Sequence, residues 1–203
     1  MTLFSDRAGS SGPCLSYGFC LVRSLLTEAP MRSILLCAFC ILTVVAQAQA
    51  TFPMLVGETA NGTAITLPMK GSAWTVIGLA YSQKATPALE DWYEPAYLRF
   101  IAKHGLMAGS YEAEVYFVPL FVGWNKAAYE ASMSKFRKSA DPAIVDHVLF
   151  SKAEIEPLRT ALGLTEKNIP YFFVLDAEGR IVHREQGAFS DEKLESIEEV
   201  LMD

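Results

Sequence analysis

Three short apolar runs stand out in the hydrophobic pattern of this chain. They lie at 74–81, 115–118 and 171–175, and they are rich in aromatic and β-branched residues. A short apolar run without alternation is typical of a strand that is buried on both faces of a sheet. The pattern therefore predicts three central strands, the second extending over 114–122 with Pro119 near its end.

Apolar residues at helical spacing follow these runs. In 86–104 they recur every three or four residues after Thr86-Pro87, a typical helix start, so we predict one helix that Pro95 bends near its middle. The cations and glycine at 103–105 are expected to end this helix. Further helices are predicted at 126–138, 153–162 and 190–202.

Glycine-containing turns divide the remaining residues into hairpins. Asn61-Gly62 predicts a turn within an N-terminal arm and hairpin at 52–68. Asp176 to Gly179 predicts a second hairpin between 171–175 and 180–185, and 147–150 is expected to form a minor strand. This order of elements predicts the α/β class, with a central mixed β-sheet flanked by helices and an N-terminal β-arm.

The first 50 residues have the pattern of a leader. A basic start at Met31-Arg32 precedes an apolar run of about a dozen residues, which is shorter than the ~20 that a membrane span needs. Ala48-Gln49-Ala50 is typical of a signal-peptidase site. We expect translation to start at Met31 and cleavage to follow Ala50; a long leader that starts at Met1 is the alternative.

The cysteines all precede this cleavage site. They are Cys14, Cys20, Cys37 and Cys40. A lipoprotein needs a small residue before its modified cysteine, whereas Leu36 and Phe39 precede the last two, so no stable membrane anchor is expected. The exported domain, residues 51–203, would therefore have neither a thiol nor a disulfide.

Charge narrows the range of partners for this single domain. Residues 51–203 carry 14 Lys and Arg against 21 Asp and Glu, a formal net charge of −7. An acidic surface disfavours nucleic acid as a partner.

Three segments carry a resemblance to a known fold family. They are the arm Phe52-Pro53-x-Leu55, the approach to the first strand at 67–74, and the segment 169–182, which begins Ile169-Pro170 and runs through the second hairpin. Their order resembles the thioredoxin-like superfamily, in particular its secreted thiol-disulfide and peroxiredoxin-like branch. The resemblance implies a thioredoxin-like fold over residues 51–203 and a cis peptide bond before Pro170. The residues alone leave that isomer open.

The resemblance also implies a reactive Cys-x-x-Cys pair where the first central strand meets the next helix. Here that place reads Ser82-Gln83-Lys84-Ala85. Disulfide exchange needs a thiolate, and a hydroxyl group has no redox couple. No catalytic residue is therefore carried over from the family, and neither a cofactor nor a metal is expected.

A binding groove is the remaining feature that the resemblance implies. In redox relatives an extended peptide pairs with the backbone beside the proline, and this recognition needs no cysteine. The expected groove has two sides, formed by Tyr81, Ser82, Gln83 and Lys84 and by Asn168, Ile169 and Pro170. Trp124 is a candidate anchor for a partner; the alternative is that it folds under its loop.

Other constellations are weaker. His104, His147 and His183 fall in three separate elements, so locally bonded or solvated histidines are favoured over a metal site. Asp146 and His147 are adjacent on a strand and point to opposite faces, which disfavours a hydrolytic triad. The cations Lys135, Arg137 and Lys138 are expected to form a solvated helix face.

The sequence thus favours a redox-inactive periplasmic or secreted protein that binds another secreted or envelope protein, as a chaperone, assembly factor or scaffold. One alternative is a non-thiol enzyme or small-ligand binder that uses the groove between Ser82–Lys84 and Pro170. Another is a redox role in which a partner supplies both thiols. An exposed aromatic patch near Pro170 or Trp124 would favour protein binding, whereas a closed pocket with convergent polar groups would favour an enzyme.

Overall fold

The apolar run that the sequence places first becomes the centre of a mixed sheet. In the computed structural model, which describes residues 50–102 and 111–202, Trp74–Ala80 forms β3. It pairs in parallel with β4 (Ala113–Pro119) and antiparallel with β6 (Tyr171–Leu175), and β7 (Ile181–Gln186) pairs with β6 at the edge. The three predicted central strands are therefore confirmed, in the order β4-β3-β6-β7.

The N-terminal arm forms the predicted hairpin. β1 (Leu55–Thr59) and β2 (Ala64–Leu67) pair antiparallel around a turn where Gly62 has φ +88°. The minor strand β5 (Leu149–Phe150) pairs with β1, and its neighbours Val148 and Ser151 form bridges to the β4 side of the central sheet. The arm is thus tied to the central sheet through β5.

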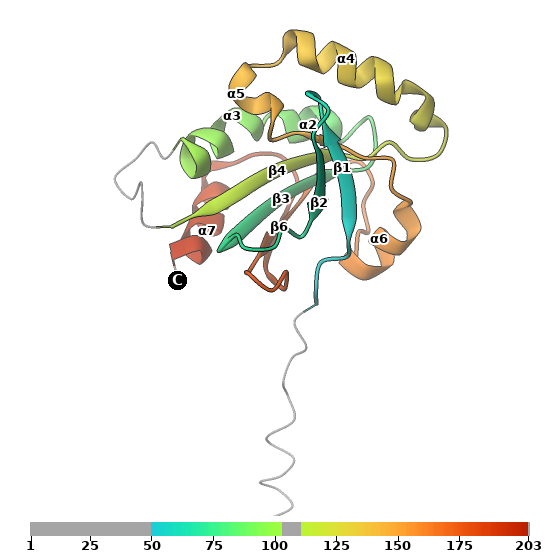
Figure 1. Ribbon diagram of the computed structural model, residues 1–203. Helices are drawn as coiled ribbons and strands as arrows, with labels where there is room; N and C mark the ends of the chain where they lie inside the picture. The colour runs from blue at the N-terminus through green and yellow to red at the C-terminus, as the bar shows by residue number, and fades with distance from the viewer. Residues whose placement is uncertain (1–49, 103–110, 203) are drawn as a thin grey trace, which may run out of the picture. The chain divides into compact units, whose positions relative to one another are not determined.

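Helices cover both faces of the central sheet. α2 (Thr86–Glu90), α3 (Tyr93–Ala96), the π-helix η1 (Tyr97–Ile101) and α7 (Asp191–Met202) lie behind the sheet in Figure 1, while the β1-β2 hairpin lies in front. α6 (Ile155–Leu162) packs with the hairpin side, because Leu158 and Leu162 share a core cluster with Leu55. The remaining helices are η2 (Gly123–Ala128), α4 (Tyr129–Ser139) and α5 (Pro142–Val145).

The predicted helix over 86–104 differs from the structure in two ways. It is divided at Asp91-Trp92 into α2 and α3, because Pro95 has no N–H for the Asp91 carbonyl and its ring would clash with that carbonyl four residues earlier. Thr86 is not its N-cap: Ala85 holds that position without a side-chain cap, and the Thr86 hydroxyl donates to the Ser82 carbonyl. The end expected at 103–105 lies outside the described residues.

The cis peptide bond also lies elsewhere than the resemblance implies. It precedes Pro68, after Leu67, whereas the Ile169–Pro170 bond is trans. The Pro170 carbonyl accepts a hydrogen bond from the Gly187 N–H at 2.8 Å. Pro170 therefore lies directly before β6, and its carbonyl is hydrogen-bonded to the residue that follows β7.

Candidate functional site

The first half of the expected groove is built by the end of β3. The β3-β6 register pairs Leu79 with Tyr171, so two residues further on Tyr81 reaches the level of Ile169. The rings of Tyr81 and Tyr171 stack with centroids 6.4 Å apart. Burial, followed by the nearby Tyr171, raises the pKa of Tyr81. Tyr81 is thus a buried contact between the two sides rather than an open binding surface.

The second half of the groove is held by a local hydrogen-bonded loop. The Tyr171 hydroxyl accepts from the Glu166 N–H at 2.6 Å and donates to the Glu166 carbonyl at 2.9 Å. Pro170 is buried, Ile169 is half-buried and Asn168 is exposed. The structure therefore brings the loop to Tyr81.

Ser82 and Gln83 turn away from that loop toward α4. The Ser82 hydroxyl accepts from the Ala85 N–H at 3.2 Å, which shapes the turn into α2. Ser82 and Gln83 help to line a hollow of about 310 Å³ between α2 and α4. We call it the α2–α4 hollow; its other lining residues are Thr86, Pro87, Glu90, Tyr93, Pro119, Leu120, Phe121, Asn125, Ser132, Lys135, Phe136, Ser139 and Phe150. Lys84 is exposed, and residues 168–170 do not line this hollow.

Aromatic rings form the inner wall of the α2–α4 hollow. Phe136 packs edge-on against Tyr93 and Phe150, with centroids 6.2 and 5.5 Å apart, and Phe121 stacks on Phe150 at 5.9 Å. These rings come from α3, α4, β5 and the segment that follows β4. The hollow is therefore lined by aromatic rings together with hydroxyl, amide and charged groups.

The two walls of the hollow carry opposite charges. Glu90 lies on the α2 wall, with Asp91 next to it, and Lys135 lies on the α4 wall, with Lys138 one turn further along. Partial burial raises the pKa of Glu90; Lys135 opposes this rise and Asp91 adds to it. The basic cluster of Lys135, Arg137 and Lys138 was predicted to form a solvated helix face. One of its members, Lys135, lines the hollow.

Trp124 stands beside the hollow with 92% of its surface exposed. It belongs to η2, and the next residue, Asn125, lines the hollow. The indole therefore does not fold under its loop. The helix that carries it is attached to the core, because the Tyr129 hydroxyl that follows donates to the Phe150 carbonyl at 3.2 Å.

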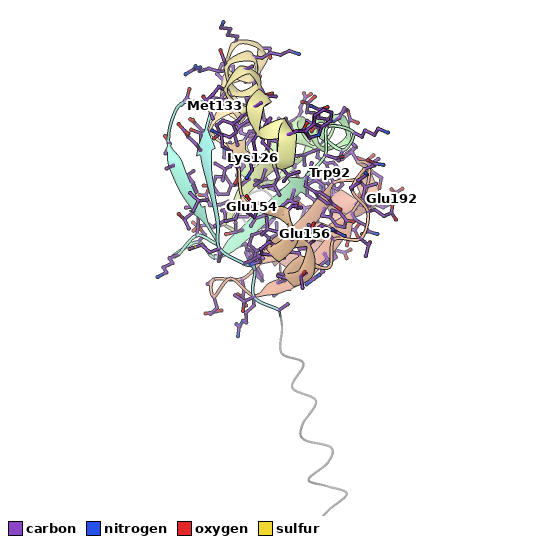
Figure 2. The ribbon with its side chains drawn as sticks, turned by 90° about the vertical axis from the view of Figure 1, so that its right-hand side faces the viewer. Trp92, Lys126, Met133, Glu154, Glu156 and Glu192 are labelled. Carbon is purple, nitrogen blue, oxygen red and sulfur yellow. The ribbon has the colours of Figure 1, made fainter. Side chains whose placement is uncertain are left out.

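An exposed ion pair adds to this attachment. Lys126 Nζ lies 2.6 Å from Glu154 Oε1, and Figure 2 shows the two side chains between α4 and α6. Such an exposed pair contributes little free energy. The pair nevertheless gives η2 a second contact with the rest of the fold, in addition to the Tyr129 hydrogen bond, while Trp124 faces solvent.

The other sequence candidates have local roles. His147 Nδ1 lies 3.0 Å from the Val115 carbonyl and His183 Nε2 lies 3.2 Å from the Ser196 hydroxyl, while His104 lies outside the described residues. Asp146 accepts a hydrogen bond from the Asn61 amide. Within 50–102 and 111–202, no three His, Cys, Asp or Glu side chains are grouped as metal ligands, and no helix is long and apolar enough to cross a membrane.

Sequence reasoning missed the α2–α4 hollow. The hollow forms only where residues 82–93 lie against residues 132–139, and no local sequence pattern predicts that contact. One signal was present: Ser132, Lys135, Phe136 and Ser139 follow helical spacing on a single face, which mixes one aromatic ring with polar groups.

Comparison with known proteins identifies the class of fold. No family model and no curated protein matches the chain. Among solved structures, it is similar to the thioredoxin domain of a thiol-disulfide oxidoreductase from Bacteroides vulgatus, with 12% identity, a TM-score of 0.52, and coverage of 75% of this chain and 96% of that one. The chain is a thioredoxin-fold protein.

Two further structures agree. A thiol:disulfide interchange protein from Bacteroides sp. is 13% identical with a TM-score of 0.51, and the match covers 76% of this chain and 90% of that one. BsSco, of the Sco family of cytochrome c oxidase assembly proteins, is 9% identical with a TM-score of 0.52, covering 75% and 94%. The fold is thus shared with thiol-disulfide oxidoreductases.

Proposed function

We propose that residues 51–203 form a redox-inactive, exported thioredoxin-fold protein that binds another secreted or envelope protein through Trp124 and the α2–α4 hollow. Its role would be that of a chaperone, assembly factor or scaffold. The observation that carries this proposal is the almost complete exposure of Trp124 beside an aromatic-lined hollow. Buried aromatic anchors in neighbouring pockets dominate the binding energy of many protein interfaces.

The chemistry of the site supports binding over catalysis. Burial raises the pKa of Tyr93, which lines the hollow, far above its usual value, so its hydroxyl stays protonated and supplies no base. Tyr111, Tyr116 and Tyr129 also owe a raised pKa first to burial, and none of them lines the hollow. Ser82 is occupied in shaping the turn into α2. The segment 51–203 offers no sulfur for disulfide exchange.

Photo-cross-linking tests the proposal. A photoreactive residue at Gln83, which lines the hollow, should give a discrete adduct with a second protein in the native compartment. The same residue at Lys193, on the far helix α7, is the control. Trp124→Ala should reduce the Gln83 adduct about tenfold or more, as removal of an interface anchor does. Equal adducts at both positions, or none, would contradict the proposal.

A small-ligand binder is the second candidate, because the volume of the hollow reaches the range of known ligand pockets. Its volume of about 310 Å³ lies at the lower limit of ligand pockets, which span roughly 300–1,000 Å³. Ser82 and Gln83, two residues of the predicted groove, help to line it. A metabolite screen by thermal shift, in which Phe136→Ala abolishes any hit while Trp124→Ala does not, would favour this candidate over protein binding.

A further inference from the structure

A second cavity continues the α2–α4 hollow toward α5. It has a volume of about 230 Å³, and we call it the α5 cavity. The residues that line both cavities are Glu90, Tyr93, Phe136 and Ser139. The two cavities are therefore parts of one groove, which reaches from Asn125 in η2 to Ile144 in α5.

The α5 cavity is acidic. The described residues that line it include two carboxylates and no cationic side chain. Glu90 comes from α2, and Asp141 stands at the start of α5, where its Oδ1 accepts from the Ala143 N–H at 2.8 Å. That bond positions the Asp141 carboxylate, whose oxygens can accept further hydrogen bonds.

Lys135 does not cancel the charge of Glu90. It lines the neighbouring hollow, but no ion pair joins its ammonium group to the Glu90 carboxylate in the described part of the chain. Partial burial raises the pKa of Glu90 in spite of the opposing effect of Lys135. The Glu90 carboxylate therefore retains a cost of desolvation that a closer cation would relieve.

Aromatic rings complete the walls of the α5 cavity. Tyr93 and Phe136 pack edge-on with centroids 6.2 Å apart, and both rings line the cavity. Ring faces attract cations, and the planar guanidinium group of arginine also stacks on them and binds carboxylates with two hydrogen bonds. Two carboxylates beside aromatic rings thus match an arginine side chain, which is apolar along its stem and cationic at its end.

We propose that the α5 cavity binds an arginine side chain of the partner protein, with the guanidinium group held by Glu90 and Asp141, while an apolar side chain of the same segment enters the α2–α4 hollow. The inference rests on the proposed function, because it names the chemistry of the segment that is bound. The formal net charge of −7 over residues 51–203 supports it, since an acidic domain attracts a basic segment at long range.

Peptide titration tests the arginine site. The full chain, under reducing conditions, is titrated by fluorescence anisotropy with two labelled peptides, Gly-Leu-Ser-Arg-Ser-Gly and Gly-Arg-Ser-Leu-Ser-Gly. Side chains two positions apart point to the same side of an extended segment, so each peptide can fill both cavities. At least one peptide should bind, and replacing its arginine with neutral citrulline of the same shape should weaken binding about tenfold.

Conservative variants locate the binding charge. Glu90→Gln and Asp141→Asn remove one charge each at nearly constant size, and asparagine also caps a helix. Each should weaken binding of the arginine peptide about threefold or more and leave the citrulline peptide unchanged. Lys135→Gln is the matched control: it removes a charge of the opposite sign from the same groove, so this variant should bind the arginine peptide at least as tightly as the wild type.

Three results would overturn the arginine site. They are no binding of either arginine peptide at about 1 mM, equal affinity for arginine and citrulline, and a Lys135→Gln variant that loses as much affinity as Glu90→Gln. The double variant E90Q/D141N separates this inference from the proposed function. If the Gln83 adduct depends on Trp124 but is unchanged in the double variant, the proposed function stands and the arginine site does not. A wild type without any Gln83 adduct would contradict the proposed function whatever the peptides show.

Discussion

At the scale of single residues, Gly78 shows how closely the central strand is packed. A Cβ atom at this position would lie 2.6 Å from the Phe172 ring and 3.0 Å from Leu89 Cδ1. Both neighbours are fully buried, on β6 and on α2, so neither can move without displacing other core residues. Gly78→Ala should therefore lower the free energy of unfolding by about 1–3 kcal/mol, measured by urea denaturation.

The control for this substitution is Thr66→Ala on the exposed face of β2, which should change the free energy of unfolding by less than about 0.5 kcal/mol. Equal stability of Gly78→Ala and the wild type would mean that Phe172 has more freedom than its contacts indicate.

At the scale of elements, one side chain connects the last helix to the segment before β4. Glu198 on α7 accepts from Arg99 at 2.7 Å and from the Tyr111 hydroxyl at 3.2 Å. The Glu198 side chain is 12% exposed, so its loss would leave the Tyr111 hydroxyl without that acceptor. Glu198→Ala should cost about 1–3 kcal/mol of unfolding free energy by urea denaturation, whereas the exposed Glu195→Ala should cost less than about 0.5 kcal/mol.

Glu198→Gln separates charge from hydrogen bonding in the same assay. Its amide oxygen can still accept from Tyr111, so an intermediate loss is expected. Equal stability of Glu198→Ala and Glu195→Ala would mean that the contact of Glu198 with Arg99 and Tyr111 adds no measurable free energy to the packing of α7.

Elements also show where sequence reasoning succeeds. The runs at β3 and β6 were predictable because a strand buried on both faces is apolar at nearly every position. The bend predicted at Pro95 is instead a division at Asp91-Trp92, because periodicity shows the buried face of a helix and not the position of the hydrogen bond that Pro95 removes. The α2–α4 hollow could not be predicted because it depends on how α4 packs against α2, two helices separated in the chain by β4.

At the scale of the whole molecule, buried tyrosines make stability depend on alkaline pH. Burial, with the nearby Glu198, Glu114 and Glu58 as smaller causes, raises the pKa of Tyr111, Tyr116 and Tyr129, each to about 12. In the unfolded chain they ionise near pH 10. Their contribution is therefore fully present below pH ~10 and is lost as pH rises from ~10 to ~12, because the unfolded state releases its protons first.

The urea midpoint should accordingly be constant between about pH 8 and 9 and fall steadily above about pH 10. Tyr129→Phe should lower the midpoint at pH ~8, through the lost bond to the Phe150 carbonyl, yet reduce the fall above pH ~10. A midpoint that falls equally in both proteins would show that Tyr129 does not contribute to the alkaline transition. Tyrosinate absorbance near pH 10 that is present in the folded wild type and lost in Tyr129→Phe would show that the Tyr129 ring is accessible to water.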